Sequence, residues 1–263
     1  MAAGIKWNLN PIEGTMPEMA RYDTAYRYSG GFNLVTTNLS GISQIPPMTP
    51  LVLDFVTRKA TAVINVKVAA ALTSSATALK VKKGSLAYVG MVLGNGSKVT
   101  TVSAIDKSNA NYDELTIAAL GDAAAVNDVL FEVVTFKITA NVAADATTAK
   151  VTKGAPVKVG DTVNIGGIDT VVSAIDTSNE GYDQLTITAL GTAKSANAVV
   201  FVKNAHKSVP NALNYAWCKV ENGATVTALG RIYELKESKL IAPVSAADKE
   251  ALGDNFIWIN DEA

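Results

Sequence analysis

Cysteine and histidine are almost absent from this chain, which has one residue of each among 263. The single Cys218 has no partner for a disulfide within the chain and cannot build a zinc cluster. It alternates with polar residues in NYAWCKV, so we interpret it as a small buried strand residue. His206 lies in NAHKSVPN, where we expect an exposed linker residue. Without a Ser/His/Asp or Cys/His set, the sequence predicts a protein that is not an enzyme and uses neither a metal nor a cofactor.

An excess of positive charge is also missing, because 23 Lys and Arg residues face 24 Asp and Glu residues. A chain without a basic surplus is a poor ligand for phosphates, so we expect neither nucleic acid nor a membrane as a partner. No stretch reaches the roughly 18 apolar residues that span a bilayer. The start, MAAGIKWNLNPIEG, lacks the pattern of a signal peptide, and we expect a protein made in the cytoplasm.

An internal duplication occupies the middle of the chain. Residues 66–133, shifted by about 70 positions, match residues 136–203 without a gap and with roughly two positions in five identical. AIDKSNANYDELTIAALG returns as AIDTSNEGYDQLTITALG. In both copies, short runs alternate Val, Ile, Leu and Thr with polar residues and end at Gly, Asn, Asp or Ser, which is typical of antiparallel strands. We predict two small β-barrels or sandwiches that fold alike.

The repeated passage contains a cluster of oxygen-bearing side chains that resembles a calcium loop. In the first copy these residues are Asp106, Ser108, Asn109, Asn111 and Asp113. The second copy replaces Asn111 by Gly181 and Glu114 by Gln184, and it has no closing bidentate glutamate. No His, Arg or Lys arrangement beside the acids favours a catalytic carboxylate pair. We therefore interpret both passages as metal-free, non-catalytic turns held by Asp and Asn side chains, with Tyr112 packing across the first and Tyr182 across the second.

The segment over residues 1–57 differs from the repeats, because it holds five of the eight prolines and little alternation. Such a segment is extended and commonly lies on another surface, for which Tyr and Arg are favourable contact residues. We predict an extended arm that anchors the protein. A mobile leader, or packing of its aromatic residues against the first repeat of the same chain, remains an alternative. The candidate contacts are Trp7, Arg21, Tyr22, Tyr26, Arg27 and Tyr28.

The C-terminal part reads as two alternating strands around the turn ENG at residues 221–223, followed by one short helix. Ser245 and Asp248 form the pattern of a capping box, and Gly253 is the expected stop. The predicted fold class is mainly β, with an extended N-terminal arm, two tandem β-barrel or sandwich-like repeats, and a C-terminal hairpin region. The corresponding boundaries are 1–57, 58–134, 135–204 and 205–263.

The repeated KVKKG…VG…TTVSAIDKSNANYDELTIAALG and the closing KVENGATVTALGRIYELKESKLIAPVSAADKEALG resemble the head fibre proteins of tailed phages, especially those of Bacteroides and related gut bacteria. The resemblance covers most of the chain from about residue 64 onward. It implies a non-enzymatic virion component on the capsid surface, made in the bacterial host cytoplasm. It also implies the major capsid protein as a partner and a homo-oligomer, with a trimer favoured.

Two function classes follow from these observations. The first is a head fibre whose N-terminal arm anchors it to the capsid and whose β repeats project outward. The repeats are small and Ala-rich and each buries little apolar area, which also favours self-association. The alternative is an adhesin module of a phage tail or a cell surface that binds carbohydrate or another host-surface ligand. A glycan site needs aromatic side chains along a groove, and the low aromatic content of 6% weakens this alternative. A hydrolase is weaker still, because no nucleophile is paired with a base.

Overall fold

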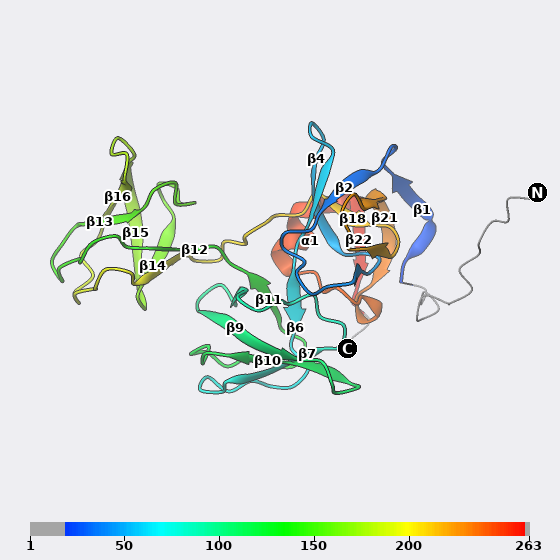
Figure 1. Cartoon of the computed structure of the whole chain (residues 1–263), viewed down its shortest axis with the longest axis horizontal. Helices are drawn as coiled ribbons and strands as arrows, with labels where there is room; N and C mark the ends of the chain where they lie inside the picture. Colours follow the sequence, from blue (N-terminus) through cyan, green and yellow to red (C-terminus); the bar gives the residue numbers. More distant parts are fainter. Residues whose placement is uncertain (1–18, 261–263) are drawn as a thin grey trace, which may run out of the picture.

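The computed structural model describes residues 19–260 and contains three β modules (Figure 1). Residues 1–18 and 261–263 lie outside the described residues, and so does the predicted contact Trp7. The first module, which we call the base, combines residues 19–64 with residues 205–260. Its strands are β1 (Arg21–Arg27), β2 (Phe32–Val35), β3 (Gln44–Ile45), β4 (Pro50–Asp54), β5 (Lys59–Ala62), β18 (Ala212–Asn214), β19 (Cys218–Lys219), β20 (Thr225–Val226), β21 (Ala228–Lys236) and β22 (Phe256–Ile259).

The main sheet of the base curls until its pairing path returns on itself. Its strand order is β1-β21-β18-β4-β5-β2-β20, with β22 also paired to β21. Only Thr227 separates β20 from β21, so the last strand of the path continues into one of the first. After β21 come the 3-10 turn η1 (Glu237–Lys239), the helix α1 (Ala246–Leu252) and the 3-10 turn η2 (Gly253–Asn255). The predicted capping box at the start of α1 is present, with Ser245 and Asp248 in reciprocal bonds.

The segment that the sequence predicts as an arm is, from residue 21 onward, part of this sheet. Strand β1 pairs with β21, β2 with β20 and β4 with β18, so the two ends of the chain build one module. The expected boundaries separate residues 1–57 from residues 205–263, and the structure joins the two. The physical reason is that backbone N–H and C=O groups of extended segments need partners, and here each end of the chain supplies them to the other.

The two copies of the duplication have the same topology, which confirms the prediction that they fold alike. Repeat 1 contains β6 (Asn65–Lys67), β7 (Ala78–Lys82), β8 (Val92–Gly94), β9 (Val99–Asp106), β10 (Tyr112–Ile117) and β11 (Val129–Glu132). Repeat 2 contains β12 (Thr135–Lys137), β13 (Thr148–Thr152), β14 (Thr162–Ile165), β15 (Ile168–Asp176), β16 (Tyr182–Ile187) and β17 (Val199–Val202). The orders β6-β11-β8-β9-β10-β7 and β12-β17-β14-β15-β16-β13 correspond strand by strand. Bridges from Val68 to Val81 and from Ile138 to Val151 link the first and last strands, so each sheet closes into a small barrel.

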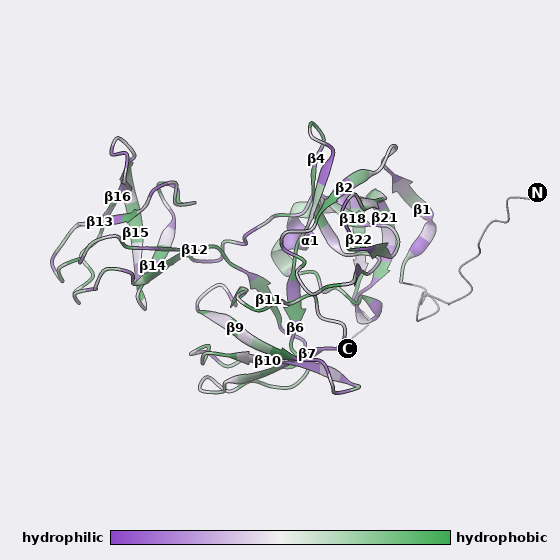
Figure 2. Ribbon diagram, in the orientation of Figure 1, coloured by the Kyte–Doolittle hydropathy of each residue, from purple (hydrophilic) through white to green (hydrophobic). Residues whose placement is uncertain are grey.

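The alternation of apolar and polar residues in the sequence corresponds to an alternation of buried and exposed side chains in the structure. In β13, for example, Ala149 and Val151 are buried while their neighbours are exposed. Both hydrophobic and hydrophilic residues accordingly occur in the strands of each module (Figure 2), although β17 is hydrophobic throughout. The mainly β fold class with one short C-terminal helix is confirmed.

The hydrophobic clusters show which modules share a core and which module has its own. Repeat 1 and the base share one hydrophobic cluster, in which Leu86 and Leu93 of repeat 1 join Phe32 and Ile45 of the base. Repeat 2 has a cluster of its own, built from residues between Phe136 and Val202. A small cluster of Phe131, Val133 and Phe201 joins the two repeats. Repeat 2 lies at one end of the longest axis, while repeat 1 lies against the base (Figure 1).

Candidate functional site

The predicted contact residues within the described part of the chain lie on or directly after β1. Among residues 19–260, this strand pairs only with β21, so it forms an edge of the base sheet. It lies at the end of the molecule opposite repeat 2 (Figure 1). The structure divides these residues into an inward group and an exposed group, and the register shifts on both sides of Tyr26 interrupt the regular alternation of faces along β1.

Tyr22 and Tyr28 pack inward. Tyr22 meets Tyr215 edge to face, with ring centroids 6.1 Å apart, and its buried hydroxyl has no hydrogen-bond partner among residues 19–260. Burial, and then the nearby Tyr215, raise the pKa of Tyr22. Tyr28 packs edge to face on Phe32 and Phe55. The alternative of packing within the same chain therefore holds for these two side chains, although the partners named here belong to the base and not to repeat 1.

Arg21, Tyr26 and Arg27 point toward solvent. Arg21 is held by Asp23 at 3.1 Å and Glu234 at 3.5 Å, and Asp23 is the main cause of its raised pKa. Tyr26 is 55% exposed and leans edge-on against Tyr28. The guanidinium of Arg27 lies 5.0 Å from the ring centre of Tyr215, a cation–π contact that fixes its position.

Strand β21 adds an arginine and a tyrosine that sequence reasoning did not single out. Arg231 is the Cα partner of Tyr26, and Tyr233 is the partner of Arg21. Arg231 is exposed, with its guanidinium 5.8 Å from the ring centre of Tyr233. The run GRIYEL repeats the mixture of Arg and Tyr found in RYDTAYRY, which is the signal that could have linked the two segments.

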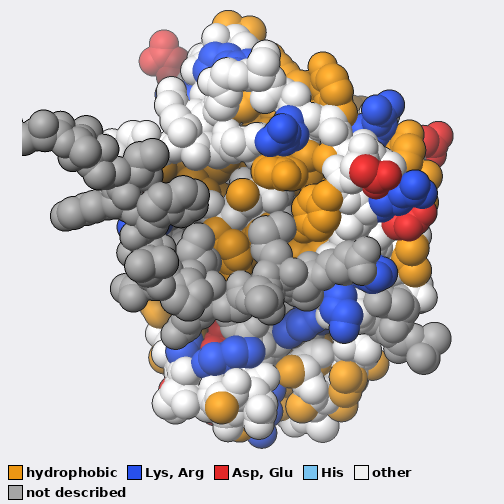
Figure 3. Space-filling view, turned by 90° about the vertical axis from the view of Figure 1, so that its right-hand side faces the viewer, with side chains coloured by type: hydrophobic (Ala, Val, Ile, Leu, Met, Phe, Trp, Pro, Cys, Tyr) orange, Lys and Arg blue, Asp and Glu red, His pale blue; other side chains and the backbone are white. Residues whose placement is uncertain are grey.

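We call this set of side chains the Tyr–Arg surface, defined by Tyr26, Arg27, Tyr215, Arg231 and Tyr233. Figure 3 views the molecule from the end that carries β1 and shows hydrophobic side chains next to Lys and Arg on this face. Interface cores are enriched in Tyr and Arg, because these side chains combine apolar area with hydrogen-bond donors. The composition of the surface is therefore that of a protein contact.

The twin Asp/Asn passages have a structural role in both copies. Asp106 accepts a hydrogen bond from the backbone N–H of Ser108 at 2.8 Å, and Asn109 accepts one from Asn111 at 2.9 Å. In repeat 2, Asp176 and Asn179 make the same bonds to Ser178 and Gly181, both at 2.9 Å. The backbone bond from Ser108 is the main cause of the lowered pKa of Asp106. The oxygens that resembled metal ligands therefore hold the turns.

The later aspartate of each passage connects two turns of its barrel. Asp113 is buried and accepts bonds from the backbone N–H groups of Gly84 at 3.1 Å and Ser85 at 2.9 Å, with the ammonium of Lys83 at 3.0 Å. In repeat 2, Asp183 forms the equivalent ion pair with Lys153. The hydrogen bond from Lys153 is the main cause of the lowered pKa of Asp183. Within residues 19–260, no group of three or more His, Cys, Asp or Glu side chains is placed to hold a metal ion.

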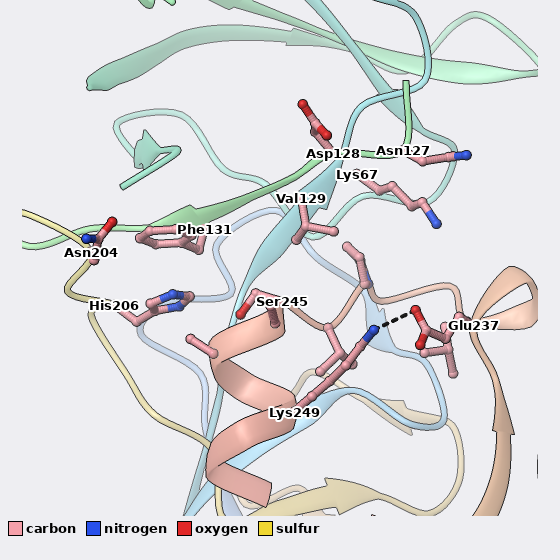
Figure 4. Close-up of a pocket in the computed structure, with 15 residues that line it drawn as sticks. Lys67, Asn127, Asp128, Val129, Phe131, Asn204, His206, Glu237, Ser245 and Lys249 are labelled. Atoms are coloured by element: carbon pink, nitrogen blue, oxygen red, sulfur yellow. Dashed lines mark hydrogen bonds and ion pairs between the residues drawn. The ribbon is translucent and has the colours of Figure 1, made fainter. Parts of the chain in front are cut away.

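A cavity lies where repeat 1, the segment after repeat 2, and α1 meet (Figure 4). It measures about 450 Å³. His206 lines it and stacks on Phe131, with ring centroids 3.6 Å apart and an interplanar angle of 13°. Its Nδ1 lies 3.7 Å from a carboxylate oxygen of Asp248, and only 7% of its side chain is exposed. The expectation of an exposed linker residue at His206 is wrong, because the chain returns from repeat 2 through the gap between repeat 1 and α1.

Polar contacts fix repeat 1 on the base around this cavity. Asp248 of α1 accepts a bond from the amide of Asn65 in β6 at 2.7 Å, in addition to its capping bond. Lys207, in the segment after repeat 2, lies 2.7 Å from Glu132 of β11, which also accepts a bond from the hydroxyl of Tyr88. Burial is the main cause of the lowered pKa of His206, and Asp248 opposes it. The junction is therefore a structural contact between modules.

The two repeats differ at the face that repeat 1 turns toward the base. Leu86 is buried, and its counterpart in repeat 2 is the exposed Pro156. Tyr88 is half-buried, and its counterpart is the exposed Lys158. Leu86 and Tyr88 thus lie where the base covers the face, whereas their counterparts in repeat 2, a proline and a lysine, are exposed. Repeat 2 presents this face to solvent.

Comparison with known proteins identifies one family. A family model described as "Head fiber protein" matches residues 5–151, which is more than half of the chain. No curated protein and no solved structure matches. No helix among residues 19–260 is long and apolar enough to cross a membrane. The match covers the N-terminal strands of the base, all of repeat 1 and the beginning of repeat 2. The chain therefore belongs to the phage head fiber protein family and is a structural phage protein of the virion.

Proposed function

We propose that this protein decorates the phage capsid without enzymatic activity, attaching by the β1 end of the base and carrying repeat 2 outward. The observation that supports this most directly is the position of β1 and repeat 2 at opposite ends of the longest axis (Figure 1). A contact surface at one end and a solvent-facing module at the other are what attachment and display require.

We propose different roles for the two repeats, although the sequence predicts the same role for both. The sequence predicts that both repeats project, whereas repeat 1 shares its hydrophobic cluster with the base. Repeat 2 has its own cluster, and its counterparts of Leu86 and Tyr88 are exposed. We therefore assign repeat 1 to the attachment body and repeat 2 to display.

The partner that we propose for the base is the major capsid protein. Tyr26, Arg27 and Arg231 are the described residues that we expect to contact it, and Trp7 remains a further candidate. We also propose that copies of this chain associate on the capsid, with a trimer favoured by the family resemblance. Light scattering of the purified chain at micromolar concentration tests this association, and a mass equal to one chain would count against it.

Electron microscopy of decorated particles tests the attachment. Purified chain is added to capsids that lack fibres, and the density of the decorating protein is compared with the structure. We expect the base next to the shell and repeat 2 at the greatest radius. Absence of binding would reject capsid decoration, while binding with repeat 2 against the shell would reject the proposed polarity.

Glycan binding and the identity of the host are separate questions. The glycan-binding alternative is tested with a panel of host-surface glycans immobilised on a chip, on which the whole chain should show no specific retention. The resemblance to proteins of Bacteroides phages also stays a prediction, and it concerns the host and not the mechanism.

A further inference from the structure

We infer that the Tyr–Arg surface recognises a short acidic loop of the major capsid protein. This inference rests on the proposed attachment and adds the chemistry of the contact. Three features of the surface lead to it: the charge of its arginines, a hollow beside Tyr26, and the irregular backbone of β1.

The charge of the surface is not satisfied within the described chain. Arg21 has carboxylate partners in Asp23 and Glu234. Arg27 and Arg231 are exposed, and neither has an ion pair among residues 19–260. Each guanidinium instead lies near a tyrosine ring, at 5.0 Å and 5.8 Å from the ring centres. Stacking on a ring leaves the edge donors of a guanidinium free to bind a carboxylate with two parallel bonds.

A hollow lies beside Arg231 and the exposed Tyr26. It measures about 310 Å³ and is lined by Tyr26, Tyr28, Gly230, Arg231 and Asn255. Gly230 is needed to form it, because a Cβ at this position would lie 2.6 Å from the ring of Tyr28. A hollow of this kind beside exposed Tyr and Arg side chains is typical of the residues that dominate binding energy at protein interfaces.

The backbone of β1 argues against addition of a long strand. Its pairing with β21 shifts register between Arg21 and Tyr26 and again between Tyr26 and Arg27. Irregularities of this kind twist an edge strand and discourage pairing with another chain. Side chains therefore supply the recognition, and a short loop with carboxylates fits the two free guanidiniums better than an extended strand does.

The test measures binding of the whole chain to fibreless capsids by co-sedimentation. We expect Arg27→Gln and Arg231→Gln each to weaken binding by about 10-fold or more, because each removes a charge from a desolvated pair. Arg21→Gln is the matched control on the same strand, and we expect less than about a 3-fold change, since Arg21 is engaged by exposed carboxylates of its own chain. Binding of the wild type should also weaken with salt, and the double variant should lose most of this dependence.

The outcomes separate the inference from the proposed function. If the wild type does not bind capsids, the attachment itself is rejected. If the wild type binds and the double variant binds within about 2-fold of it, the acidic contact is rejected while attachment stands. Arg27→Lys and Arg231→Lys should recover part of the loss, because they keep the charge without the planar fork. Failure of these lysine variants to bind better than the glutamine variants would also reject a carboxylate partner.

Discussion

His206 and Phe131 lie face to face, 3.6 Å apart between ring centroids, although one residue follows repeat 2 and the other belongs to repeat 1. This stack holds the returning chain against repeat 1 and places the imidazole beside Asp248 of α1. The contact makes the junction sensitive to the protonation state of His206.

The first prediction concerns pH. Burial lowers the pKa of His206 below its ordinary value of 6.5, so the unfolded chain takes up a proton at higher pH than the folded chain does. The contribution of neutral His206 to the stability of the folded chain is complete above pH 6.5. It is lost as pH falls from 6.5 toward the lower pKa that His206 has in the folded state. Thermal melting between about pH 7.5 and 5.5 should show this loss, and His206→Gln should reduce it. A melting temperature that rises over this range would show that pairing with Asp248 outweighs burial.

The second prediction compares equivalent positions of the two repeats. Leu86→Ala should lower the free energy of unfolding by about 2–4 kcal/mol, because Leu86 is buried between repeat 1 and the base. Pro156→Ala, at the same position of repeat 2, should change it by less than about 0.5 kcal/mol, because this residue is exposed. Urea unfolding of both variants gives the comparison. Equal losses would contradict the assignment of repeat 1 to the base.

The third prediction concerns the buried aspartate of the repeated passage. Asp113→Ala leaves the N–H groups of Gly84 and Ser85 without their acceptor, and we expect a loss of about 2–3 kcal/mol. Because repeat 2 has its own core, Asp183→Ala should weaken repeat 2 and leave the rest of the molecule unchanged. Hydrogen exchange resolved by segment measures the two effects. Loss of protection throughout the chain in the Asp183 variant would show that the modules unfold together.

The fourth prediction concerns the close approach of Tyr28 to Gly230. Gly230→Ala should destabilise the base by about 1–3 kcal/mol, since the new methyl group meets the tyrosine ring at 2.6 Å. Gly181→Ala is the control, because its Cβ would have only an ordinary contact with Asn179 at 3.5 Å. Thermal melting distinguishes them. A Gly230 variant as stable as the control would mean that Tyr28 moves away at little cost.

The fifth prediction is that calcium does not bind the twin turns. The oxygens of Asp106 and Asn109 are used as acceptors for backbone N–H groups, and repeat 2 uses Asp176 and Asn179 in the same way. Calorimetric titration of the chain with calcium should therefore give no heat of binding. A binding signal that disappears in Asp106→Asn together with Asp113→Asn would overturn the structural interpretation of these passages.

Local patterns in the sequence were sufficient to predict the repeats and the helix. Alternation of apolar residues, the shift of about 70 positions and the Gly, Asn and Asp turns together predict paired barrels, because strands within a repeat pair over short distances along the chain. The capping box of Ser245 and Asp248 likewise depends only on residues three positions apart.

The tertiary structure decided which segments meet. Strand β1 finds its partner in β21, and Arg21 and Glu234 in this pair are separated by 213 positions. Neither segment alone specifies that partner, because any extended edge offers the same N–H and C=O groups. The burial of Tyr22, Tyr28 and His206 depends on this assembly as well. The short-range periodicity of the sequence therefore predicts the strands and turns. The partners of strands that lie far apart in the chain are decided only when the two ends of the chain form one sheet around a common core.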